Sequence, residues 1–88
     1  MNQPVPPDPS LRVIVSTFAT QAAVALGQIA NPATNQTEID LGRAKFNIDL
    51  VQVLKEKTAA NATEEESKYT DDCLYQLRML FIDKSAKK

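Results

Sequence analysis

The stretch from Leu41 to Phe81 constrains the fold most, because apolar residues recur in it at the three- and four-residue steps of a helix face. Two such runs flank a short polar connector. Thr63 at the end of this connector and Glu66 in the following run have the spacing of a capping box, in which two residues bind each other's backbone amides where a helix begins. The stretch therefore predicts two helices, over about residues 38–57 and 64–83.

A third helical pattern precedes this stretch and predicts a helix over about residues 10–30. Asp8 or Ser10 can cap its start, and Pro32 biases the residue before it away from the helical conformation. Its main apolar face consists of Leu11, Ile14, Val15, Phe18, Ala22, Leu26 and Ile29. No charged residue occurs between Arg12 and Glu38. A helix without a charged face is normally buried on more than one side.

Polar residues also predict how the middle helix begins and ends. Thr37, with Asp40 three residues later, resembles a capping box at its start. Asn61 tolerates the left-handed conformation that ends many helices. The four structural caps that we predict are therefore Thr37, Asn61, Thr63 and Glu66.

Each predicted helix has more apolar surface than one core covers. The middle helix has one face of Leu41, Ala44, Ile48 and Val51 and another of Ile39, Phe46, Leu50, Val53 and Leu54. The last helix has a lesser face of Tyr75, Met79 and Ile82 beside its main face of Thr70, Cys73, Leu74, Leu77, Leu80 and Phe81. A bundle helix needs only one inward stripe. We therefore expect an all-α helical bundle of three main helices, completed by homodimerisation.

The residues that we assign to self-association are Val13, Thr17, Val24, Phe46, Leu50 and Val53. A monomeric bundle with scattered apolar residues on its surface is the alternative.

The chain of 88 residues has the size of one domain. Residues 1–9 hold four of the five prolines and are expected to form a disordered arm. Residues 10–83 form the single helical domain, and residues 84–88 are expected to be a basic, frayed tail.

Composition argues against several classes of function. The net charge is -1, and basic residues cluster only in the tail, so nucleic acid is not an expected partner. The apolar span 13–30 contains several polar residues, which argues against a membrane segment. The single cysteine, Cys73, has no histidine to act with, so we interpret it as a buried apolar residue. A chain with one cysteine fits the reducing cytoplasm.

Several short motifs resemble those of a small bacterial domain-of-unknown-function family, number eighteen forty-four. These motifs are 41–45, 48–49, 53–58, 61–63 and 77–78, with Phe18, 21–22, 26–27 and 31–32 upstream, so the resemblance covers about residues 15–82. The family pattern has Gly-Asn-Leu-Thr where this chain has Ala60-Asn61-Ala62-Thr63. Without that glycine, Asn61 is the better cap. The resemblance implies a bacterial, cytoplasmic, helical protein and supplies no activity.

We therefore expect a small self-associating protein that acts as a binding or scaffolding module, and not an enzyme. No cofactor or metal ion is expected, and an unidentified protein is a further partner to consider. One alternative is a dimeric regulator that contacts nucleic acid. The other is a metal-dependent helical enzyme that uses Asp49, Asp71 or Asp72.

Overall fold

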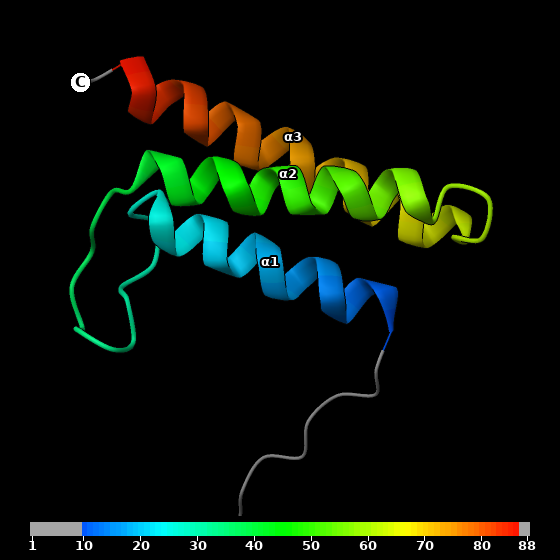
Figure 1. Ribbon diagram of the computed structural model, residues 1–88, viewed down its shortest axis with the longest axis horizontal. Coiled ribbons are helices and arrows are strands. Elements are labelled where there is room, and N and C mark those ends of the chain that lie inside the picture. The colour runs from blue at the N-terminus through cyan, green and yellow to red at the C-terminus, as the bar shows by residue number, and fades with distance from the viewer. Residues whose placement is uncertain (1–9, 87–88) are drawn as a thin grey trace, which may run out of the picture.

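The computed structural model describes residues 10–86, which form three α-helices (Figure 1). The helices are α1 (Leu11–Ala25), α2 (Leu41–Lys57) and α3 (Glu64–Ala86). The chain reverses direction after α1 and again after α2, so α3 runs in the same direction as α1 (Figure 1). The predicted all-α class with three main helices is confirmed. The proline-rich arm, Lys87 and Lys88 lie outside the described residues.

All three pairs of helices are in contact, and they enclose a small core. The buried apolar residues are Val15, Ala22, Ala25, Leu26, Ala44, Ile48, Val51, Leu74 and Leu77. Three of these nine are alanine, and small side chains shorten the distance at which two helices pack. Arg12 of α1 adds a cation–π contact, with its guanidinium carbon 4.6 Å from the ring centre of Tyr69 in α3.

Two buried polar side chains satisfy their hydrogen bonds within their own helices. The Asn47 side-chain amide donates to the Arg43 carbonyl oxygen at 3.0 Å, and the Thr70 hydroxyl donates to the Glu66 carbonyl oxygen at 2.9 Å. Neither group therefore carries the cost of an unpaired buried polar atom.

Helix α1 ends at Ala25, and the expected continuation to Ala30 is wrong. Gly27 takes a left-handed conformation with φ +78°. Its amide donates to the Val24 carbonyl oxygen, and the Gln28 amide donates to the Ala23 carbonyl oxygen, both at 3.0 Å. This pair of bonds is a Schellman motif, which glycine favours because it has no Cβ to clash. The helix thus ends before Pro32 has any effect, and Ile29 leaves the helix face.

Residues 26–40 form an ordered, hairpin-like loop between α1 and α2. The Asp40 amide donates to the Ala25 carbonyl oxygen at 2.7 Å, and Leu26 pairs with Ile39 in an isolated bridge. At the tip, the Asn31 amide donates to the Gln36 carbonyl oxygen at 2.9 Å. These bonds hold the start of α2 beside the end of α1.

Asp40, not Thr37, caps α2. Its carboxylate accepts from the Arg43 amide at 3.0 Å, and the helix begins at Leu41 rather than near residue 38. The Thr37 prediction is wrong because Ile39 pairs in extended conformation with Leu26, which prevents a helix from starting earlier.

The Thr63–Glu66 capping box joins the end of the connector to the first turn of α3. The Glu66 amide donates to the Thr63 hydroxyl at 3.1 Å, and the Thr63 amide donates to the Glu66 carboxylate at 2.8 Å. Thr58, not Asn61, caps the end of α2, where its amide and hydroxyl both donate to the Leu54 carbonyl oxygen.

The left-handed conformation expected at Asn61 is wrong. Among the described residues other than glycine, only Asn35 has a positive φ, of 59°. The Asn61 amide instead donates to the Thr58 carbonyl oxygen at 2.9 Å, which turns the chain without a left-handed residue.

Helix α3 continues to Ala86, beyond the expected end at residue 83. Lys84 and Ser85 are therefore helical and half-buried rather than part of a frayed tail. A lysine in the last turn is also favoured by the negative end of the helix dipole.

We predict that Gly27→Ala destabilises the protein by about 1 kcal/mol or more, because alanine is strained at φ +78°. Its Cβ would also approach Ile39 Cγ1 to 3.1 Å. Gly42→Ala is the matched control, since its Cβ would meet only Asp40 Oδ1 at an ordinary 3.7 Å. Urea denaturation measures both free energies of unfolding. Equal values for the two variants would contradict the role of Gly27.

We also predict that Asp40→Ala costs about 0.5–2 kcal/mol, the usual loss when an N-cap residue becomes alanine. Thr37→Ala should change the free energy of unfolding by less than about 0.5 kcal/mol, because Thr37 is exposed and outside the helix. Thermal unfolding of both variants distinguishes the two caps. A larger loss for Thr37→Ala would reverse the assignment.

Candidate interaction surface

The outer surface of α2 carries three apolar side chains four and three residues apart, Phe46, Leu50 and Val53, which we call the α2 stripe. Phe46 is 62% exposed and Val53 47% exposed, while Leu50 is half-buried. Their neighbours Ala44, Ile48 and Val51 form the buried face of the same helix. The core of a single chain therefore does not fully cover the stripe.

The uncharged outer face of α1 carries the other residues assigned to self-association, Val13, Thr17 and Val24. Val13 and Val24 are half-buried, and Thr17 is exposed. The Thr17 hydroxyl donates to the Val13 carbonyl oxygen at 2.9 Å. Because this hydroxyl already has an acceptor in its own helix, covering the face would not cost a free hydrogen-bond donor.

The α2 stripe and the α1 face lie on neighbouring parts of the surface. Arg43 of α2 lines a pocket together with Thr20, Gln21 and Val24 of α1, so Arg43 marks the side of α2 nearest to α1. Leu50 is seven residues, or about two helical turns, after Arg43 and therefore lies on the same side. The structure thus brings the two predicted groups of residues onto adjoining surfaces.

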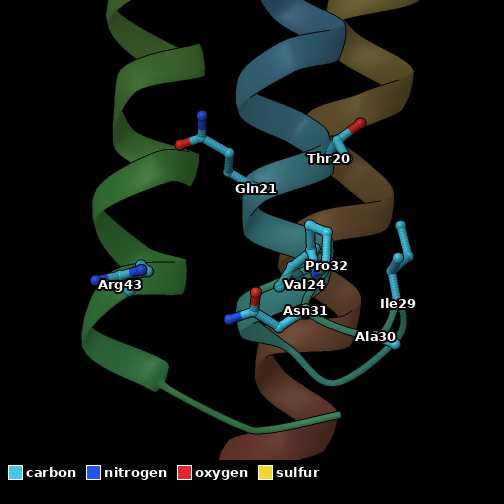
Figure 2. Close-up of a pocket in the computed structure, with 8 residues that line it drawn as sticks. All are labelled: Thr20, Gln21, Val24, Ile29, Ala30, Asn31, Pro32 and Arg43. Carbon is cyan, nitrogen blue, oxygen red and sulfur yellow. The ribbon is translucent and has the colours of Figure 1, made fainter. Parts of the chain in front are cut away.

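This pocket has a volume of about 440 Å³ and opens where α1 ends (Figure 2). Its lining is Thr20, Gln21, Val24, Ile29, Ala30, Asn31, Pro32 and Arg43. Figure 2 shows Gln21 extending toward α2, with Ile29 and Ala30 beyond the other side of α1. Mostly apolar walls with amide and guanidinium groups suit contact with another protein surface. The pocket was not predicted, because it depends on the early end of α1 at Gly27.

Helix α3 carries a second apolar stripe, Tyr75, Met79 and Ile82, which we call the α3 stripe. These side chains are 67%, 51% and 61% exposed. This lesser apolar face is visible in the sequence, but it is not among the residues predicted for self-association. Its spacing of four and three residues, identical to that of the α2 stripe, was the signal available.

Polar contacts join α2 to α3 beside the α3 stripe. Lys55 Nζ lies 2.7 Å from Asp71 Oδ1, and the Arg78 guanidinium donates to the Gln52 side-chain oxygen at 2.6 Å. Tyr75 is four residues after Asp71, and Ile82 is four residues after Arg78. Since residues four apart share a helix face, the α3 stripe leans toward the side of α3 nearest to α2.

The residues considered for metal or nucleophilic chemistry have other surroundings. Asp49 pairs with Lys45, with Nζ to Oδ2 at 2.7 Å, and Asp71 pairs with Lys55. Asp72 is exposed. Cys73 is half-buried and packs against the core. Within residues 10–86, no group of three or more histidine, cysteine, aspartate or glutamate side chains is placed to hold a metal ion. None of the helices in this range has the length and apolarity needed to cross a membrane.

The sequence matches the family model of a domain of unknown function, DUF1844, over residues 8–83. The chain belongs to this family. No curated protein and no solved structure matches it.

The DUF1844 match takes in α1, α2 and most of α3, and so includes both stripes, the pocket and the α1 face. It also includes Gly27 and the Thr63–Glu66 capping box, which set where helices end and begin. The family supplies no activity, so a function for this DUF1844 protein has to be inferred from its surface.

We predict that Met79→Ser changes the free energy of unfolding by less than about 0.5–1 kcal/mol, because Met79 is half exposed. Leu77→Ala, two residues away but buried in the core, should cost about 2–5 kcal/mol. Chemical denaturation of both variants checks whether the α3 stripe is free surface. A cost for Met79→Ser as large as that for Leu77→Ala would place Met79 in the core.

Proposed function

We propose that this DUF1844 protein is a self-associating binding or scaffolding module whose smallest assembly is a homodimer. The observation that carries the proposal is the exposure of Phe46 and Val53 beside the uncharged face of α1. Apolar surface gathered in this way on a soluble domain usually marks an interaction site.

The energetics favour an interface that combines the two surfaces. Burying apolar surface yields about 25 cal/mol per Å², whereas association costs about 4–15 kcal/mol in lost freedom. A stable interface therefore needs about 800 Å² from each partner. The three side chains of the α2 stripe supply only part of that area, and the adjoining α1 face, whose own residues carry no charge, extends it.

Helix α2 is held in place on its inner side and at both ends. A surface held in this way suits binding better than a function that requires large movements. Core residues fix α2 on its inner side, and the Thr63–Glu66 box and the Ala25–Asp40 bond fix the segments at its two ends. Binding to a surface held in place costs less conformational entropy than binding to a flexible one.

We predict that Phe46→Glu weakens self-association at least tenfold, because a carboxylate in the interface would have to lose its hydration. Sedimentation equilibrium from about 10 μM to 1 mM, a range that corresponds to association free energies of about -7 to -4 kcal/mol, measures the dissociation constant. Ala59→Glu adds the same charge in the exposed connector and should leave the constant unchanged. A wild-type chain that stays monomeric over the whole range would overturn the proposal.

A further inference from the structure

We draw no further inference here: the strongest candidate, the pocket between the end of α1 and the start of α2, identifies no class of ligand, because its basic lining residue, Arg43, is exposed and follows the acidic Glu38 and Asp40 closely in the chain, so nothing in the structure shows what fills it.

Discussion

The reversal of the chain after Ala25 is the constraint on which the rest of the structure depends. Gly27 ends α1 in a left-handed conformation, and the Asp40 amide then returns to bind the Ala25 carbonyl oxygen. These two features place α2 against α1 with opposite direction, close enough for alanines to form part of the core. Helix α3 joins this pair through the capping box and the apolar contacts of Leu74 and Leu77. The pocket and the α1–α2 surface are consequences of the same reversal.

The periodicity of apolar residues predicted the three helices, because the spacing that places side chains on one helix face is contained within a few turns of sequence. The Thr63–Glu66 box was visible for a similar reason, since both of its residues lie within one helical turn. The ends of α1 and α2 were misplaced because contacts distant in sequence decide them. Ile39 is held extended by Leu26, which rules out a cap at Thr37. Gly27 was the available signal for the end of α1, but its position on an apolar helical pattern obscured it.

The candidate surface was predictable only in part. The surplus of apolar residues on α2 followed from the sequence, because no single core can cover both faces of a helix. Which of two faces points inward depends on the neighbouring helices, and for α3 this left Tyr75, Met79 and Ile82 without an assigned role. Their spacing of four and three residues repeats that of the α2 stripe.

The closed base of the 26–40 loop separates the length of its tip from the packing of the helices. The Ala25–Asp40 bond joins the two ends, so residues between Asn31 and Gln36 can be lengthened or replaced without moving α1 or α2. The entropy of closing a loop grows slowly, by about 0.6 kcal/mol for each doubling in length. The tip can therefore accept substitutions or an inserted peptide at a small cost in the free energy of folding, while α1 and α2 keep their relative positions.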